Sequence, residues 1–218
     1  MSIISQLKKQ FVPEIIAKLQ SKYNGTIFVK DGYGSRYIHT EVSEVTQSGG
    51  ITQNLWPPVL KKIALPRKSW LILGLAGGTL AKQISTHYSP SRMVGVEIDP
   101  VMIEIGKKYF ALDQVPNLEI VESDANRFVM NSKHHFDYIL VDLYLGDKIP
   151  NFISDPQFLN KLSRLGSYVV FNRLFYTPAM RRSAQEFTKS LSAYFSHIRL
   201  IRSLANLLII ARAKPDDI

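Results

Sequence analysis

The chain has 218 residues, of which 45% are hydrophobic, and it carries 27 Lys and Arg against 18 Asp and Glu. This length and composition fit one globular domain, or one domain with a small appendage, and exclude a disordered, collagen-like or coiled-coil chain. The absence of Cys excludes disulfides, zinc–thiolate sites and thiol nucleophiles. Because the sequence has neither a long apolar run nor the pattern of a secretory signal, we expect a cytoplasmic protein with no membrane partner.

The net charge of +9 is distributed unevenly along the chain. Residues 95–147 hold ten acidic and four basic side chains, a net charge of −6, so the remainder carries +15. A basic balance of this size makes nucleic acid a candidate partner, but the sequence has no stripe of aromatic and basic residues of the kind that stacks on bases. A site built from the middle of the chain would instead lie in a negative local field.

The first part of the chain predicts small, separate elements. Residues 3–20 place apolar side chains at helical spacing and predict an amphipathic helix that is interrupted by Pro13. Residues 26–29 and 36–42 predict two strands on either side of a glycine-containing turn, and residues 54–63 predict a short helix. We therefore assign residues 1–66 to an N-terminal helix and β-hairpin appendage.

The second part, residues 67–218, alternates apolar strands with amphipathic helices. That alternation predicts βαβ units and a parallel sheet covered on both faces. The last two apolar segments, HIRLIRSL and NLLIIARA, flank a turn and predict an antiparallel strand pair at the sheet edge. The predicted fold class is α/β, a doubly wound Rossmann-like sheet with an antiparallel C-terminal strand pair and a small N-terminal β appendage. The strands are predicted at 70–74, 93–97, 118–122, 137–142 and 167–171, and the helices at 78–87, 100–110, 124–131, 156–164 and 178–195.

A glycine-rich loop follows the first strand of this second part, in the segment LILGLAGGTLAKQI. Gly74, Gly77 and Gly78 allow a sharp turn and bring the backbone close to a ligand, although tight packing of a strand against a helix also requires glycine. Glu97 ends the next strand, where a carboxylate accepts hydrogen bonds from both hydroxyls of a ribose. The loop and the carboxylate together favour a nucleoside ligand.

Two further strand ends carry acidic residues. Asp124 follows the strand LEIV and has two compatible roles, as the N-cap of the next helix and as an acceptor for an adenine amino group. Asp142 ends the apolar strand FDYILV. Ile98, which follows Glu97, either lies against an adenine face or belongs to the core. Since ligands of open parallel sheets bind beyond the carboxyl ends of the strands, these positions predict a nucleoside-type ligand at one edge of the sheet.

Other features have simpler interpretations. Asp99 precedes Pro100 and is predicted to cap the helix that begins there. The segment 143–155, with Gly146 and Pro150, has the composition of turns and forms either a lid over the site or an ordinary surface loop. The five histidines and the carboxylates show no metal-ligand spacing, so we expect no metal.

At these motifs the sequence resembles a known family. The segments GLAGGTLA, VGVEIDPVMIEIGKKYFAL, SDANRFV and DYILVDLYLGDKIPNFISDPQFL are similar to the class I S-adenosylmethionine-binding fold, and more narrowly to its spermidine synthase-like (polyamine aminopropyltransferase) group. The resemblance covers roughly residues 20–172. The run at 142–150 is similar to a branch of this group that is often fused to membrane segments.

The resemblance implies a role for each of these positions. Asp142 would be the catalytic acidic residue, which orients the attacking amine and accepts its proton, and Tyr144 and Asp147 would hold the substrate. A small-molecule amine is the implied substrate, and a homodimer built through the N-terminal segment is the implied assembly. The implied set for S-adenosylmethionine or decarboxylated S-adenosylmethionine is Gln47, Gly74, Ala76, Gly77, Gly78, Glu97, Ile98, Asp124 and Ala125.

Three positions depart from the pattern of the family. Ala76 stands where the family carries an Asp in the glycine-rich loop, Leu145 stands in place of a second acidic residue, and LWPP at 55–58 replaces a Tyr-His pair. The leading interpretation is transfer of an aminopropyl group from decarboxylated S-adenosylmethionine to a di- or polyamine. The alternatives are a methyltransferase on the same scaffold, a non-catalytic member of the family, and a nucleic-acid-binding module.

Overall fold

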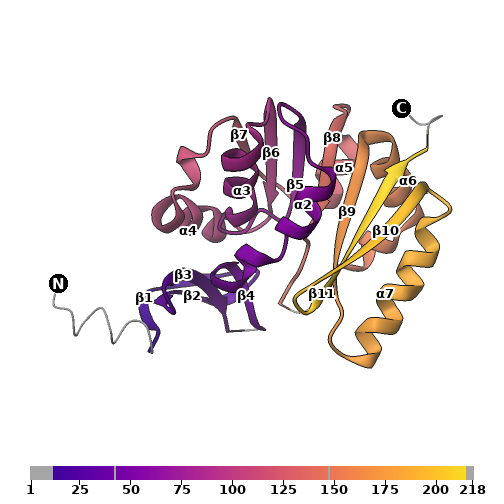
Figure 1. Cartoon of the computed structure of the whole chain (residues 1–218). Helices are drawn as coiled ribbons and strands as arrows, with labels where there is room; N and C mark the ends of the chain where they lie inside the picture. Colours follow the sequence, from indigo (N-terminus) through magenta and orange to yellow (C-terminus); the bar gives the residue numbers. More distant parts are fainter. Residues whose placement is uncertain (1–11, 42, 147, 215–218) are drawn as a thin grey trace.

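The structure is a computed structural model that describes residues 12–41, 43–146 and 148–214 (Figure 1). Two sheets account for all the strands of this part of the chain, one with four strands and one with seven. Figure 1 shows the smaller, N-terminal sheet beside one end of the larger sheet, below α3 and α4. In the part of the chain that the structure describes, no helix is long and apolar enough to cross a membrane.

The larger sheet confirms the predicted α/β class, with the strand order β10-β11-β9-β8-β5-β6-β7. Strands β5 to β9 pair in parallel with their neighbours, whereas β11 is antiparallel to both β9 and β10. The chain passes from β5 outward to β6 and β7 and then returns to β8 on the other side of β5, so the topological switch point lies between β5 and β8. The bounds are β5 (Ser69–Leu73), β6 (Arg92–Glu97), β7 (Leu118–Glu122), β8 (Phe136–Val141), β9 (Gly166–Leu174), β10 (Phe195–Ser203) and β11 (Asn206–Ala213).

Helices cover both faces of this sheet, as the alternation of apolar residues predicts. One buried cluster joins α5, α6 and α7 to one face, and a second cluster joins α2 and α3 to the other face. The predicted helices are confirmed to within a few residues, the largest difference being that α7 ends at Leu191 instead of 195. The bounds are α2 (Pro57–Ile63), α3 (Thr79–Tyr88), α4 (Pro100–Phe110), α5 (Ala125–Asn131), α6 (Pro156–Leu165) and α7 (Pro178–Leu191).

The N-terminal segment corrects the helix predicted over residues 3–20. Residues 1–11 lie outside the described part of the chain, and β1 (Glu14–Ser21) is a strand that pairs antiparallel with β2 (Gly25–Gly32). The apolar spacing of this segment suits a helix, but backbone pairing with β2 decides its conformation, because an eight-residue segment is too short for helix propensity to prevail. β3 (Ser35–Thr40) and β4 (Ser43–Gly49) complete a four-stranded antiparallel sheet in place of the predicted hairpin.

A third buried cluster joins this smaller sheet to α4. Ile27, Val29 and Ile38 of the sheet pack against Met102 and Ile105 of the helix. Burial of these side chains fixes the small sheet to the larger unit, because an apolar sheet face needs a partner to leave water. The contact brings β4 and the 3₁₀ turn that follows it to the carboxyl ends of β5 and β6.

Candidate functional site

The glycine-rich loop turns sharply where β5 ends. Gly74 has a φ of 89°, and a Cβ atom there would overlap the carbonyl oxygen of Asp142. Only glycine meets both conditions, since the left-handed conformation and the close approach each disfavour a side chain. The ends of β5 and β8 therefore come together at the switch point, with Asp142 directly beside the loop.

Glu97 is buried at the end of β6 and is held by the backbone. Its Oε2 accepts a hydrogen bond from the N–H of Ala76 at 2.8 Å, and its Oε1 accepts from the N–H groups of Ile98 at 3.0 Å and Asp99 at 3.1 Å. Burial raises the pKa of Glu97, and the three backbone donors offset part of this shift. The carboxylate is thereby fixed in one orientation toward the cavity described below.

Asp99 confirms its predicted role as the N-cap of α4. Its Oδ1 accepts from the N–H of Val101 at 3.0 Å, and its Oδ2 accepts from Asn24 at 2.6 Å and from the Ser21 hydroxyl. The side chain is fully buried, so it also ties the N-terminal sheet to the helix. Its carboxylate serves the architecture rather than the site.

Asp124 confirms the capping half of its predicted pair of roles. Its Oδ1 accepts a hydrogen bond from the N–H of Arg127 at 2.8 Å and so caps α5. Asp124 also lines the cavity, together with Ser123 and Ala125. A carboxylate oxygen has more than one lone pair, so capping leaves Asp124 able to accept a hydrogen bond from a ligand.

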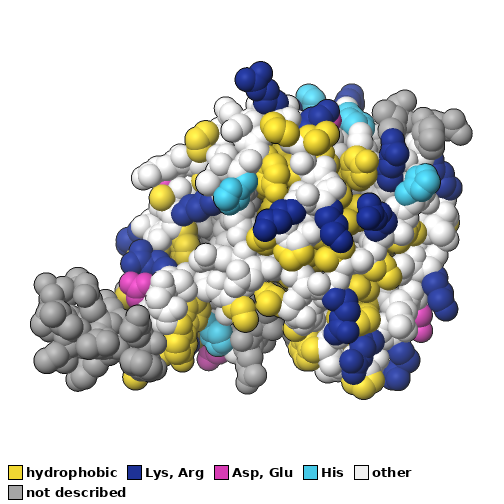
Figure 2. Space-filling view, viewed as in Figure 1, with side chains coloured by type: hydrophobic (Ala, Val, Ile, Leu, Met, Phe, Trp, Pro, Cys, Tyr) yellow, Lys and Arg dark blue, Asp and Glu magenta, His cyan; other side chains and the backbone are white. Residues whose placement is uncertain are grey.

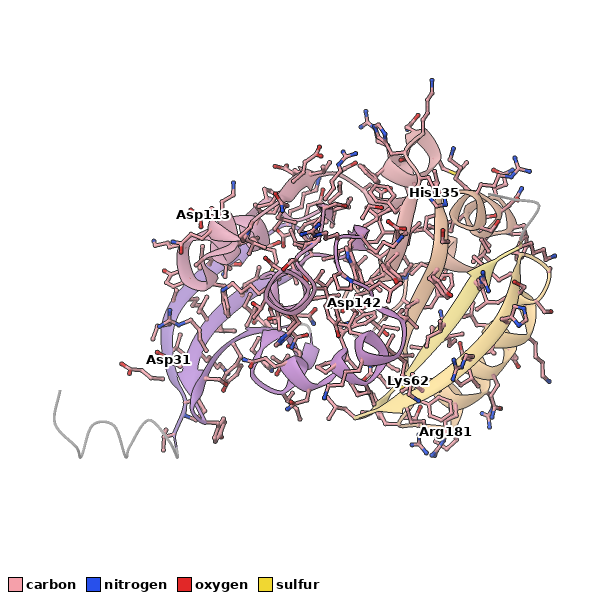
Figure 3. The ribbon with its side chains drawn as sticks, turned by 45° about the horizontal axis from the view of Figure 1, so that its top comes forward. Asp31, Lys62, Asp113, His135, Asp142 and Arg181 are labelled. Carbon is pink, nitrogen blue, oxygen red and sulfur yellow. The ribbon has the colours of Figure 1, made fainter. Side chains whose placement is uncertain are left out.

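Asp142 lies near the centre of the molecule, between the N-terminal segments and the C-terminal hairpin (Figure 3). Its Oδ2 accepts a hydrogen bond from Trp56 Nε1 at 3.1 Å, and its Oδ1 accepts from Asn172 Nδ2 at 2.8 Å. Asn206 Nδ2 in turn donates to Asn172 Oδ1 at 2.8 Å. Burial raises the pKa of Asp142, and the donors Asn172 and Trp56 offset part of this shift.

The segment after β8 folds over the same region. Tyr144 lines the cavity, and its hydroxyl donates to the backbone carbonyl of Asn172 at 2.8 Å. Leu145 and Lys148 form a short antiparallel bridge, and Phe152 of the following turn packs against the core. Asp147 lies outside the described residues, so its predicted contact with the substrate stays a prediction.

These residues surround a cavity of about 410 Å³ at the carboxyl ends of the parallel strands. Gly77 and Gly78, which were expected to contact the nucleoside, do not line it. A Cβ atom on Gly77 would lie 2.7 Å from Cδ1 of Ile38, and one on Gly78 would overlap Leu112, so both glycines permit close packing. The predicted residues that line the cavity are Gln47, Gly74, Ala76, Glu97, Ile98, Asp124, Ala125, Asp142 and Tyr144.

Sequence reasoning missed Trp56 and Asn172, the two donors to Asp142. A signal for Asn172 was available, because it is a single amide in the apolar strand that β9 forms, and a buried amide needs hydrogen-bond partners. Trp56 gave no comparable signal, since its position opposite Asp142 depends on how α2 packs. No group of three or more metal-ligating side chains gathers within the described residues.

The strand order and the position of the cavity define a Rossmann-like domain of the methyltransferase type. Solved structures agree: spermidine synthase from Thermotoga maritima has a TM-score of 0.70 at 20% identity and covers 94% of this chain and 74% of its own. Human Methyltransferase-like protein 13, in complex with SAH, has a TM-score of 0.57 at 20% identity and covers 76% of this chain and 79% of its own. At these identities the similarity establishes the fold alone.

Sequence comparison then identifies the family. Residues 58–164 match the spermine/spermidine synthase domain, and the chain therefore carries a domain of that family. The polyamine aminopropyltransferase of Vibrio vulnificus is 27% identical over 146 residues, which is 65% of this chain and 49% of that protein. The eEF1A lysine and N-terminal methyltransferase homolog of Drosophila pseudoobscura pseudoobscura is 38% identical over 94 residues, 42% of this chain and 14% of that protein. The chain thus spans half or less of the length of these two relatives.

Proposed function

We propose that the protein is a transferase that binds an adenosyl-sulfonium nucleoside and moves the aminopropyl group of decarboxylated S-adenosylmethionine to a di- or polyamine. The placement of Asp142 carries this proposal. Its carboxylate lies at the switch point, held on both oxygens, in the same cavity as Glu97 and Asp124. The family match over residues 58–164 and the relatives named as polyamine aminopropyltransferases support it.

The donor would occupy the part of the cavity beyond β5, β6 and β7. Glu97 accepts hydrogen bonds from the ribose hydroxyls in this proposal, because the backbone already orients its carboxylate. Asp124 accepts from the adenine amino group, and Ile98 lies against the face of the base. Gln47 and Gly74 complete this part of the wall.

The reaction is a single displacement. The neutral amine nitrogen forms a bond to the carbon next to the sulfonium, and the carbon–sulfur bond breaks with its electron pair passing to sulfur, which leaves methylthioadenosine. The proton of the amine passes to Asp142 and then to solvent. Trp56 and Asn172 hold the carboxylate in place, so it is positioned before the substrate arrives.

A second candidate function, methyl transfer from S-adenosylmethionine itself, is favoured by the residue at position 76. Ala76 supplies only its backbone N–H, to Glu97, and therefore no carboxylate for the ammonium of a decarboxylated donor. One relative of the chain is named as a methyltransferase homolog. The two candidates predict different nucleoside products.

Calorimetry with those two products distinguishes them. We expect methylthioadenosine to bind at least about tenfold more tightly than S-adenosylhomocysteine, a difference of about 1.4 kcal/mol. Turnover with decarboxylated S-adenosylmethionine and a diamine should then release methylthioadenosine. Tighter binding of S-adenosylhomocysteine would transfer the assignment to methyl transfer, and binding of neither would reject both functions. The homodimer, the cytoplasmic location and the substrate contacts of Tyr144 and Asp147 stay predictions.

A further inference from the structure

A second cavity, which none of the proposed chemistry uses, lies on the other side of the glycine-rich loop. It is a groove of about 650 Å³ between the small sheet and the ends of α3 and α4. Thr79 lines both cavities, and its Oγ1 accepts from the N–H of Gly49 at 2.7 Å, so one layer of residues separates them. The residues that line the groove are Gly34, Ser35, Arg36, Gly49, Gln53, Thr79, Lys82, Gln83, Lys107, Lys108, Tyr109, Phe110, Ala111 and Gln114.

The charged residues that line this groove are all positive. Four of its residues are cationic, and no Asp or Glu is among them. Asp31 pairs with Arg36 at 3.1 Å from outside the lining, and Arg36 also donates to the backbone carbonyl of Tyr109 at 3.2 Å. Within the described residues, no carboxylate lies within ion-pair distance of Lys82 or Lys107.

Lys82 has the most informative environment of the four cations. Its side chain is half-buried, and burial alone lowers its pKa, with no carboxylate acting in the opposite direction. The neighbouring Gln83 donates to the backbone carbonyl of Gln53 at 2.6 Å, but its Oε1 is buried and has no hydrogen-bond partner in the described residues. A partly desolvated cation without a carboxylate partner costs free energy that a bound anion would recover, and the unsatisfied oxygen of Gln83 leaves a second polar group without a partner at the same wall of the groove.

From this geometry we infer that the groove binds a small polyanion of the oligophosphate class, with Lys82, Lys107 and Lys108 as its charged contacts. Several cations around one groove require a ligand with more than one negative charge. Gln83 and Gln114 add amide groups to the lining, and these suit a nucleoside triphosphate, whose base and ribose supply further hydrogen-bond donors and acceptors, better than inorganic triphosphate. This site does not depend on the proposed transfer reaction.

The test is calorimetric titration of the full chain with inorganic triphosphate, with a nucleoside triphosphate and with a short single-stranded RNA, all at physiological ionic strength. We expect one saturable site for a triphosphate. Lys82→Gln should weaken it by about tenfold or more, and Lys107→Gln by about threefold to tenfold. Since Lys107 is exposed, its loss leaves the fold intact and keeps the test valid if Lys82→Gln is unstable. Lys82→Arg should retain most of the affinity.

Lys62→Gln is the matched control, because it removes one charge from an exposed position on α2. Figure 3 shows Asp31, whose partner Arg36 lines the groove, at the left edge of the molecule, and Lys62 well away from it, to the right of the centre. Lysine and arginine side chains occur at many places on the face of the molecule that Figure 2 shows, so the control measures the effect of general charge. Equal weakening by Lys62→Gln and Lys82→Gln, the absence of saturable binding, or binding of RNA alone would overturn the proposal.

Discussion

Asp142 accepts one hydrogen bond on each carboxylate oxygen, from donors that lie far apart in the chain. Trp56 comes from the turn before α2, and Asn172 lies near the carboxyl end of β9. Burial disfavours the charged form of Asp142, whereas the two donors favour it, and the balance leaves its pKa raised. A carboxylate with a raised pKa is a better proton acceptor than an exposed one, which suits the role proposed for it.

The raised pKa gives a prediction for the dependence of turnover on pH. The proposed reaction needs Asp142 ionised, so the acid limb of kcat/KM should lie above the range of an exposed Asp, and turnover should fall as pH falls through it. The sign for stability is opposite: folding favours the protonated form, so the contribution of this group decreases as pH rises from the unfolded toward the folded pKa. Asp142→Asn should lower kcat by about 10²- to 10⁴-fold.

Asp137→Asn provides a matched control for this substitution. Asp137 lies at the opposite end of β8 and accepts hydrogen bonds from the N–H of Ser69 at 2.8 Å and from Lys68 at 2.9 Å. Its replacement should cost stability and leave turnover within about threefold. Binding of methylthioadenosine, measured by calorimetry, should survive Asp142→Asn. Full activity of the Asp142→Asn protein, or an acid limb in the ordinary Asp range, would contradict the role of Asp142.

At the scale of single elements, the glycine-rich loop decides how closely β5 and β8 approach. Gly74 combines a positive φ with the close approach to the carbonyl of Asp142. Gly34 in the β2–β3 turn has a positive φ as well, of 76°, but a Cβ atom there would have open space around it. A comparison of substitutions at Gly74 and Gly34 therefore distinguishes the free-energy cost of the positive φ from the cost of the steric contact with Asp142.

Gly74→Ala should be considerably more destabilising than Gly34→Ala. Gly34→Ala should lower the free energy of unfolding by about 1 kcal/mol, the cost of the left-handed conformation alone. Gly74→Ala should lower it by that amount and by about 1–3 kcal/mol more, because its Cβ atom also overlaps the backbone of Asp142. Urea unfolding of the two variants measures the difference. An equal decrease in the free energy of unfolding for the two variants would mean that β8 shifts to accommodate the added methyl group. The close approach of β5 and β8 would then contribute nothing to stability.

At the scale of the whole molecule, the small sheet and the larger unit share buried structure. Apolar side chains of β2 and β3 pack against α4, and the buried carboxylate of Asp99 accepts hydrogen bonds from Ser21 and Asn24 as well as from its own helix. A carboxylate out of water needs all of these donors. We therefore expect residues 12–66 and the larger unit to unfold together.

Asn24→Ala tests this junction. Loss of this donor leaves the buried Oδ2 of Asp99 with the Ser21 hydroxyl as its one remaining donor among the hydrogen bonds described above, so the free energy of unfolding should fall by about 1–3 kcal/mol in a single transition. Asn131→Ala is the control, because Asn131 is exposed and donates only to the backbone carbonyl of Arg127 in its own helix. Two separate transitions, followed by circular dichroism and by Trp fluorescence, would show that the small sheet folds independently.

Local sequence pattern determined most of the larger unit. The spacing of apolar residues distinguished its strands from its helices. A helix that is buried on one face has apolar residues at every third or fourth position, whereas a strand that is buried on both faces is apolar along its whole length. Acidic residues at the ends of β6, β7 and β8 predicted where a site lies, since strand polarity is shared across a parallel sheet. The caps Asp99 and Asp124 could also be predicted, because a cap acts on its own helix.

The other features of the fold and the site were decided by tertiary structure alone, because each depends on a contact between residues that are distant in the chain. The segment Glu14–Ser21 is a strand because β2 pairs with it, although its own spacing suits a helix. Gly77 and Gly78 lie beside Ile38 and Leu112 and do not line the cavity, which depends on where the small sheet and α4 lie. Trp56 reaches Asp142 only because α2 packs across the switch point, and no local pattern contains that contact.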